Sequence, residues 1–186
     1  MKERCSWVTD SQLYKNYHDK EWGIPVFDDK TLFEFLILET FQAGLSWITI
    51  LNKRENFRKA LDNFDYNKIA TYKESKYESL LIDTGIIRNK LKIRSAITNA
   101  QVFIEIQKEF GSFSQFIWSY VNNKPIINKF LKKGDVPATT TLSDTISKDL
   151  RKRGFKFVGS TIIYAHMQAC GLINDHVTEC FRYKEV

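Results

Sequence analysis

Apolar residues recur along most of this chain at the three- and four-residue steps of an amphipathic α-helix. The clearest run extends from Asp29 to about Phe41, behind an aspartate cap, and Glu39 falls near its apolar side. A second helix is predicted to begin with Ser46 as its N-cap and to continue through WITILNKRENFRKAL. The short segment QAGLSW therefore joins two helices directly after a carboxylate that is flanked by hydrophobic residues.

Further segments carry the same helical pattern, namely NKIATY, KYESLLIDTG, NKLKIRSAITNAQVFIEIQKEFG, SFSQFIWSYV, TLSDTISKDLRKRG and STIIYAHMQACGL. Several stop at a glycine that can form a left-handed C-cap, and these glycines are Gly85, Gly111, Gly154 and Gly171. No set of strands with two-residue alternation competes with the helices, so we predict an all-α fold. The polar segment 122–141 contains two prolines and is interpreted as a surface connection within a single domain that spans residues 1–186.

Composition and charge narrow the class of protein. With 186 residues, of which 43% are hydrophobic, the chain can bury one sizeable core. It contains no apolar run of ~18 residues and its N-terminus lacks the apolar part of a secretory signal, so we expect a soluble cytoplasmic protein without a membrane partner. The net charge of +6 favours a polyanionic partner such as nucleic acid, although many basic proteins bind none.

The three cysteines are an odd number, which argues against a disulfide framework. His176 and Cys180 are one helical turn apart, and Cys5 and His18 supply the same two ligand types near the other chain end. These four side chains would fill the tetrahedral shell of Zn²⁺ and make a structural site. Because ~160 residues separate the pairs, the alternative is that the four are unconnected.

Neighbouring residues extend this hypothesis. Asp19 and Asp175, beside the two histidines, are candidates to accept hydrogen bonds from the imidazoles. Cys170 lies in an apolar helical segment and is expected in the core, and His166 has no ligand-like partner nearby in the sequence.

Aromatic residues crowd the polar segment YKNYHDKEWG, which contains Tyr14, Tyr17 and Trp22 and follows Trp7. Rings in such a basic, polar context can stack on nucleic-acid bases. The alternative, that they cover a helical core, is favoured for any single ring.

The stretch SLLIDTGIIRNKLKI predicts two helices joined by a tight turn at Gly85. Such a turn can direct backbone N–H groups and a helix N-terminus at a phosphate, and Arg88, Lys90 and Lys92 lie nearby. Many helical hairpins look similar and bind nothing, so this pattern alone is a weak indication.

Taken together, ERCSWV, YHDKEWG, QAGLSWITIL, GIIRNKLKI, KRGFKFVG and MQACGLINDHVTEC resemble the 3-methyladenine DNA glycosylase I family, in order and in spacing. The resemblance runs from Arg4 to about Cys180 and is weakest between Asn123 and Thr141. It implies the helical fold of the helix-hairpin-helix DNA glycosylase superfamily, with the hairpin near residues 77–94. It also implies a structural zinc that joins the N- and C-terminal segments.

The resemblance assigns roles to individual residues. It implies that the zinc ligands are Cys5, His18, His176 and Cys180. It implies that Glu39 recognises the base and acts in catalysis, in a pocket formed by Tyr17, Trp47, Trp7, Tyr14 and Trp22. For DNA, we hypothesise that Gly44 permits close backbone approach and that Leu45 wedges into the gap left in the duplex. The hairpin residues Gly85, Arg88 and Lys90 are the expected contacts to the DNA backbone.

The implied reaction is hydrolysis of the N-glycosidic bond of a flipped 3-methyladenine nucleotide, which leaves an abasic site without strand cleavage. Superfamily members usually carry a catalytic aspartate about a helix beyond the hairpin. The matching stretch offers only Glu105, and the family lacks that aspartate, so we assign Glu105 no catalytic role. Glu39 could stabilise charge, bond to the base or position water, and the sequence does not separate these roles.

We expect a monomer that acts on double-stranded alkylated DNA and releases free 3-methyladenine. Two other classes fit part of the sequence: a zinc-stabilised helical DNA-binding protein without catalysis, and a basic helical protein with a small-molecule pocket. The first leaves a carboxylate within an aromatic pocket unexplained, because a buried acid costs desolvation unless something positive binds it. The second is distinguished by whether the protein binds duplex DNA with a steep salt dependence.

Overall fold

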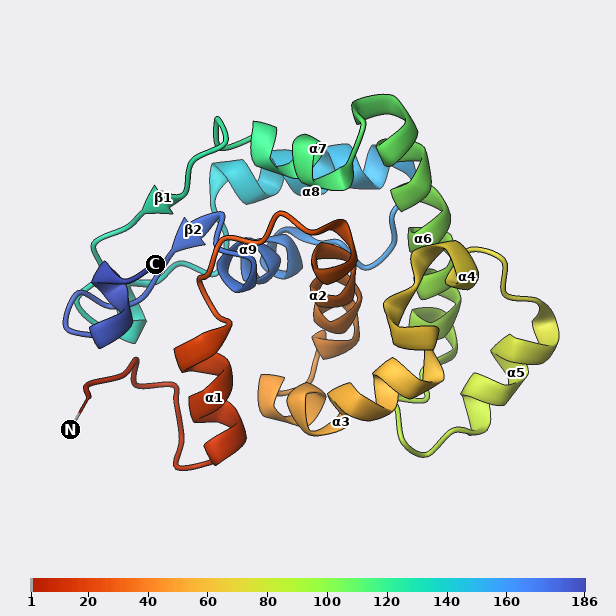
Figure 1. The fold of residues 1–186 in the computed structure, drawn as a ribbon, viewed down its shortest axis with the longest axis horizontal. Coiled ribbons are helices and arrows are strands. Elements are labelled where there is room, and N and C mark those ends of the chain that lie inside the picture. The colour runs from red at the N-terminus through yellow and green to blue at the C-terminus, as the bar shows by residue number, and fades with distance from the viewer. Residues whose placement is uncertain (1) are drawn as a thin grey trace.

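The computed structural model of the protein describes residues 2–186, and most of these are helical (Figure 1). The α-helices are α1 (Gln12–Lys20), α2 (Asp29–Gln42), α3 (Trp47–Ala60), α4 (Tyr66–Ile69), α5 (Glu74–Ile82), α6 (Lys90–Phe110), α7 (Phe113–Ser119), α8 (Thr141–Arg153) and α9 (Ser160–Ala169). Three short 3₁₀ turns are η1 (Asp62–Phe64), η2 (Lys133–Asp135) and η3 (Phe181–Lys184). The all-α prediction is confirmed in part, because the fold is mostly helical but also contains one short pair of strands. Within the described residues, no helix is both long and apolar enough to cross a bilayer.

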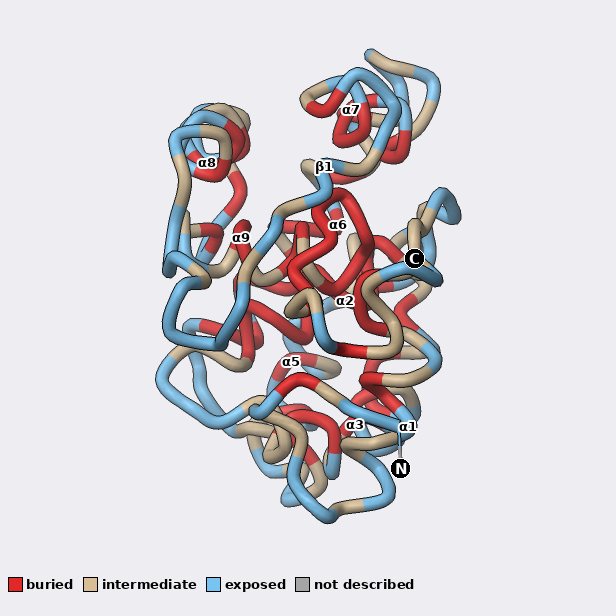
Figure 2. Tube along the Cα trace, turned by 90° about the vertical axis from the view of Figure 1, so that its left-hand side faces the viewer, coloured by how far each residue is buried: buried red, intermediate tan, exposed pale blue. Residues whose placement is uncertain are grey.

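Helix α2 is the central element, and α3, α6, α7 and α9 pack around it (Figure 1). The sequence pattern predicted one apolar stripe on this helix, and that prediction was too narrow. Every position from Leu32 to Phe41 is buried, so Glu34, Glu39 and Thr40 are enclosed together with the apolar residues. Figure 2 shows buried positions concentrated in the interior of the molecule and exposed positions along its outer loops.

Two adjacent aspartates fix the start of α2. The Asp28 carboxylate caps α2 and accepts a hydrogen bond from the backbone N–H of Thr31 at 2.8 Å. The Asp29 carboxylate instead accepts from the N–H groups of Phe113, at 2.9 Å, and Ser114, at 2.7 Å, at the start of α7. The first turn of α2 therefore also holds the first turn of α7.

The predicted starts and ends of helices are largely confirmed. Ser46 precedes α3 as its N-cap residue, although its hydroxyl pairs with the Thr49 hydroxyl at 2.7 Å rather than with a backbone N–H. The prediction that Gly85 is a left-handed C-cap was wrong. Helix α5 already ends at Ile82, and the Gly85 N–H instead donates to the Asp83 carboxylate at 2.7 Å within the following turn.

The segment 122–141 is more structured than the sequence indicated. It contains the strand β1 (Ile126–Ile127), which pairs in parallel with β2 (Ile173–Asn174). The Asn128 side chain also donates to the Asp175 carboxylate at 2.7 Å. These bonds attach the segment to the C-terminal part of the chain, where it lies at the left of Figure 1.

Candidate active site

A cavity of about 330 Å³ opens beside the C-terminal half of α2. Its walls come from α1, α2, α3 and α9, from the N-terminal segment and from the segment 133–138. All six residues that the sequence placed in a pocket line this cavity: Trp7, Tyr14, Tyr17, Trp22, Glu39 and Trp47. The volume lies in the range of small-ligand pockets.

Glu39 is the acidic group that α2 contributes to the cavity wall. Its side chain is 4% exposed, and burial raises the pKa of the carboxyl from 4.5 to about 8. No neighbouring cation or hydrogen-bond donor in the described part of the chain offsets that effect. The cavity therefore holds a carboxyl group that retains its proton near neutral pH and that a positive ligand would ionise.

Aromatic rings surround this carboxyl group. The Tyr17 ring centroid lies 5.4 Å from that of Trp47, and Trp7 lies 5.1 Å from Tyr14 and 5.0 Å from Trp22. Burial, and then the charge of Glu39, raise the pKa of the Tyr17 hydroxyl well above its usual value, so this phenol stays protonated. These rings make a wall on which a flat, electron-poor ring could stack.

Trp47 adds a polar feature to this wall. Its indole Nε1 is buried and has no hydrogen-bond partner among residues 2–186. An unpaired buried donor costs free energy that a ligand with an acceptor atom would recover. Trp47 reaches the cavity because it is the first residue of α3, directly after the turn that follows α2.

That turn, residues 42–46, carries the predicted wedge. The Leu45 N–H donates to the Gln42 carbonyl at 2.7 Å, and Ala43 (φ −47°, ψ 115°) and Gly44 (φ +82°) adopt the angles of a type II turn. The third position of such a turn requires positive φ, which explains the glycine. The turn leaves the Leu45 side chain 38% exposed at the surface.

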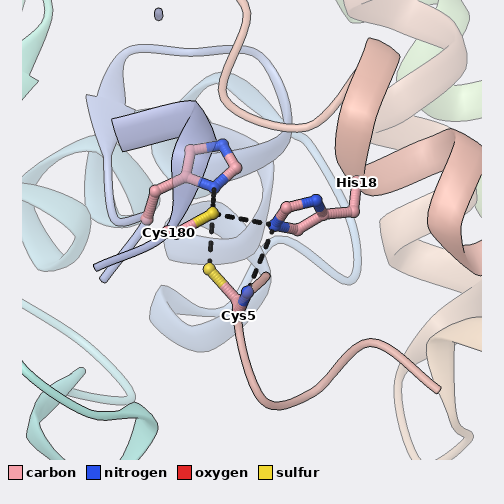
Figure 3. A group of neighbouring side chains, drawn as sticks. Cys5, His18 and Cys180 are labelled. Carbon is pink, nitrogen blue, oxygen red and sulfur yellow. Dashed lines mark hydrogen bonds between the residues drawn. The ribbon is translucent and has the colours of Figure 1, made fainter. Parts of the chain in front are cut away.

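The four predicted metal ligands come together behind the cavity, and all are buried. Their donor atoms lie within 4.8 Å of one another, with Cys180 Sγ 3.4 Å from both His18 Nε2 and His176 Nδ1 (Figure 3). Cys5 Sγ lies 3.6 Å from His176 Nδ1. Hydrogen bonding from the Cys5 thiol, and then from the two imidazoles, holds the pKa of the Cys180 thiol well below its usual range. Two sulfurs and two imidazole nitrogens this close together could hold a metal ion, and thiolate with imidazole is a donor set that suits Zn²⁺.

The outer nitrogen of each imidazole is also bonded. His18 Nδ1 lies 2.8 Å from the Asp19 carboxylate, as predicted, and His176 Nε2 lies 3.1 Å from the Trp22 carbonyl. The suggestion that Asp175 bonds to His176 was wrong. The Asp175 carboxylate instead accepts from the Tyr164 hydroxyl at 2.6 Å, Gln168 Nε2 at 2.8 Å and Asn128, because the chain turns it toward α9.

The Cys/His cluster and the cavity share a wall. The Trp22 ring packs 4.5 Å from the His176 imidazole, and the Trp7 ring packs 5.3 Å from that of His18. Cys5 itself also lines the cavity. The geometry of the cluster therefore determines where the two indoles lie.

Helices α5 and α6 flank the predicted hairpin turn, residues 83–89. The Asn89 side chain caps α6 by accepting from the N–H groups of Leu91 and Lys92, at 3.0 and 3.1 Å. Arg88 and Lys90 are exposed, whereas Lys92 is buried. The hairpin residues do not line the cavity. Glu105, to which no role was assigned, pairs with Lys108 on the surface.

Sequence reasoning missed two groups of residues. The first is the cavity wall formed by α9 and the segment 133–138, which consists of Thr161, Tyr164, Ala165, Gln168, Lys133, Val136, Pro137 and Ala138, with Asp175 and Val177 beyond it.

The second is a buried ion network, in which Arg54 Nε donates to Glu34 at 2.6 Å and Arg58 to Glu34 at 2.7 Å. Arg54 also bonds to Glu21 at 2.5 Å, so the network joins α3, α2 and the end of α1. An acid within an apolar helical run signals such a partner, because buried carboxylates are normally paired.

His166 of α9 and Cys170, the C-cap residue of that helix, were not assigned to the metal site, and both are buried. Cys170 lies in the core as expected. His166 Nε2 lies 3.1 Å from the Leu32 carbonyl, and burial lowers the pKa of this imidazole to about 4.

Comparison with known proteins gives consistent matches over nearly the whole chain. A family model described as methyladenine glycosylase matches residues 7–183. The chain is 49% identical over 181 residues to DNA-3-methyladenine glycosylase 1 of Escherichia coli (strain K12), covering 97% of each chain. A crystal structure of 3-methyladenine DNA glycosylase I superposes with a TM-score of 0.94 at 49% identity, covering 96% of this chain and 98% of the other. A variant of such an enzyme in complex with 3-methyladenine superposes with a TM-score of 0.93 at 35% identity, covering 96% of each chain.

Proposed function

The chain belongs to the methyladenine glycosylase family, and on that premise we propose that it removes 3-methyladenine from alkylated DNA. The reaction is hydrolysis of the N-glycosidic bond of a flipped nucleotide by water, which leaves an abasic site. Residues 1–186 act as one domain and as a monomer. The observation that carries the proposal is Glu39, which is buried without a partner among residues 2–186 in a cavity walled by aromatic rings.

The charge of the substrate explains the selectivity. Methylation at N3 makes the base of the nucleotide cationic, which also weakens its bond to the sugar. A cation in the cavity would lower the pKa of Glu39 and attract its carboxylate, and the rings of Tyr17 and Trp47 would stack on the positive base. Neutral adenine gains neither interaction, so binding of the damaged base is linked to release of a proton from Glu39.

Within the cavity each residue has a separate task. Glu39 compensates the positive charge and accepts a hydrogen bond from the base. Tyr17 and Trp47 hold the ring, and the unpaired Trp47 Nε1 supplies a donor for an acceptor atom of the substrate. Trp7, Tyr14 and Trp22 complete the wall and exclude bulk water from the charged pair.

The direct test is incubation of the purified protein with DNA treated with a methylating agent, followed by chromatography of the released bases. Free 3-methyladenine should appear, adenine should not, and the strand should break only after alkaline treatment. Untreated DNA and the Glu39→Gln variant serve as controls. Failure to release any methylated base would overturn the proposal.

For the DNA contacts, we propose that Leu45 fills the gap left by the flipped base while Gly44 allows the turn to approach the duplex. Gly85, Arg88 and Lys90 contact the phosphate backbone. Leu45→Gly should weaken binding of DNA that carries a lesion and spare the affinity for free 3-methyladenine. An equal loss of both affinities would refute the wedge.

We also propose that Cys5, His18, His176 and Cys180 hold a structural Zn²⁺. The donor set and its spacing support this, since four protein ligands leave no position for a substrate. When bound, the ion would tie the chain ends together and take no part in the reaction. Metal analysis should find one zinc per chain, and Co²⁺ substitution should give the absorption bands of tetrahedral thiolate ligation. Cys180→Ser should weaken both signals.

A further inference from the structure

Lys92, in the first turn of α6, has a buried side chain and donates to the backbone of another helix. Its Nζ lies 2.9 Å from the Phe41 carbonyl and 2.6 Å from the Ala43 carbonyl. Phe41 lies in the last turn of α2, the helix that carries Glu39, and Ala43 is the C-cap residue of that helix, within the turn 42–46. The first turn of α6, directly after the hairpin, is therefore bonded both to the end of α2 and to the turn that carries Leu45.

The Lys92 ammonium group supplies hydrogen-bond donors to carbonyls at the end of α2. The last carbonyls of a helix lack intrahelical donors, and here the Leu45 N–H bonds to Gln42 instead of to Phe41. An ammonium group supplies the missing donors and places a positive charge at the negative end of the helix dipole. Burial lowers the pKa of Lys92, because removing the ammonium group from water disfavours its charged form.

The hairpin turn is held from a second side by α3. Lys53 Nζ donates to the carbonyls of Thr84 and Gly85, at 3.2 Å each. The Asn56 side chain donates to the Gly85 carbonyl at 3.3 Å. Because α2 and α3 flank residues 42–46, both ends of that turn are bonded to the hairpin unit.

We propose that Lys92 is a positioning residue that holds the turn 42–46 and the hairpin 83–89 as one rigid surface for duplex DNA. The inference rests on the proposed function. The turn and the hairpin can bind one duplex together only while the distance between them matches the DNA. Loss of the Lys92 hydrogen bonds would therefore lower the affinity for duplex DNA and leave the base pocket unchanged. Lys92 acts through the carbonyls of α2 and does not reach a phosphate.

Lys92→Met tests this inference, with Lys90→Met as the matched control on the exposed face of the same helix. For each protein, affinity is measured for a duplex with an abasic-site analogue at several salt concentrations, and for free 3-methyladenine. Lys92→Met should weaken duplex binding about tenfold, keep the salt slope, and leave free-base affinity within about twofold. Lys90→Met should lower the salt slope by about one, because it removes a phosphate contact. Lys92→Arg, which keeps donors to both carbonyls, should restore duplex binding.

The outcomes separate the inference from the proposed function. If the wild-type protein binds neither lesion duplex nor free base, the proposed function fails. If wild type binds both and Lys92→Met binds the duplex equally well, or loses both affinities in parallel, Lys92 does not position the surface. A lower salt slope in Lys92→Met would assign it to a phosphate instead. Should Lys92→Met fail to fold, Lys92→Gln, which retains one donor group, takes its place. It should likewise weaken duplex binding and preserve the affinity for free 3-methyladenine.

Discussion

Glu34 and Glu39 lie on the same central helix and are both buried, but within residues 2–186 only Glu34 has partners. Arg54 and Arg58 neutralise Glu34, and the network continues to Glu21 at the end of α1. Glu39, little more than one turn further along, faces an aromatic cavity, and the described part of the chain offers it no compensating charge. The first acid holds three helices together, and the second leaves unsatisfied a charge that a substrate can compensate.

The largest expected effect is on how the stability of Glu39→Gln, compared with that of the wild-type protein, depends on pH. The folded-state pKa of Glu39 is raised from 4.5 to about 8, so its carboxyl adds stability below pH 4.5 that is lost as pH rises through 8. Replacing Glu39 with Gln removes this loss. The unfolding free energy of Glu39→Gln minus that of wild type should grow by about 1.4 kcal/mol per pH unit across that window. Urea unfolding at a series of pH values measures it, and a constant difference would show that Glu39 is solvated.

Glu34→Gln should give the opposite stability effect. It leaves Arg54 buried with only Glu21 as a partner, and breaking a buried ion pair in this way costs about 3 kcal/mol or more. Urea unfolding at neutral pH gives the change. Activity per folded molecule should stay near wild type, because Glu34 does not line the cavity. Loss of activity without loss of stability would reverse the roles assigned to the two acids.

The kinetic effect of Glu39→Gln is expected next in size. The variant keeps the shape of the cavity and loses the charge, so kcat/KM on methylated DNA should fall about 100-fold, equivalent to about 2.7 kcal/mol. Single-turnover release of 3-methyladenine measures the chemical step separately from binding. Undiminished turnover would remove Glu39 from the mechanism.

Arg58→Met should have the smallest effect. Arg58 is about one-third exposed, and Glu34 keeps its bond to Arg54 in this variant, so stability should fall by about 1 kcal/mol. Thermal unfolding against wild type resolves such a change. A loss as large as that of Glu34→Gln would mean that Arg58, rather than Arg54, is the main partner of Glu34.

The parts of this structure that could be predicted from the sequence are those with a local signal. Helical periodicity located α2, and the serine before WITIL located the start of α3. The Cys/His quartet followed from residue type together with the family resemblance, since no local spacing joins Cys5 to Cys180. The cavity residues Glu39 and Trp47 were identified in the same way.

The missed residues depend on contacts between distant parts of the chain. The segment 133–138 has no periodic pattern, and it reaches the cavity because β1 pairs with β2 and Asn128 bonds to Asp175. Neither bond has a signature in either segment alone. The Glu34–Arg54 pair could have been predicted from the acid within an apolar run, but choosing Arg54 among the basic residues of α3 requires the packing angle between the helices.

The order in which the polypeptide is synthesised has a consequence for this cavity. The Cys/His cluster that supports Trp7 and Trp22 draws one half from each end of the chain. A nascent chain on the ribosome therefore has α2 and Glu39 long before it has His176 and Cys180. The aromatic wall cannot close until His176 and Cys180 have been translated, and this long-range step should be among the slowest in folding.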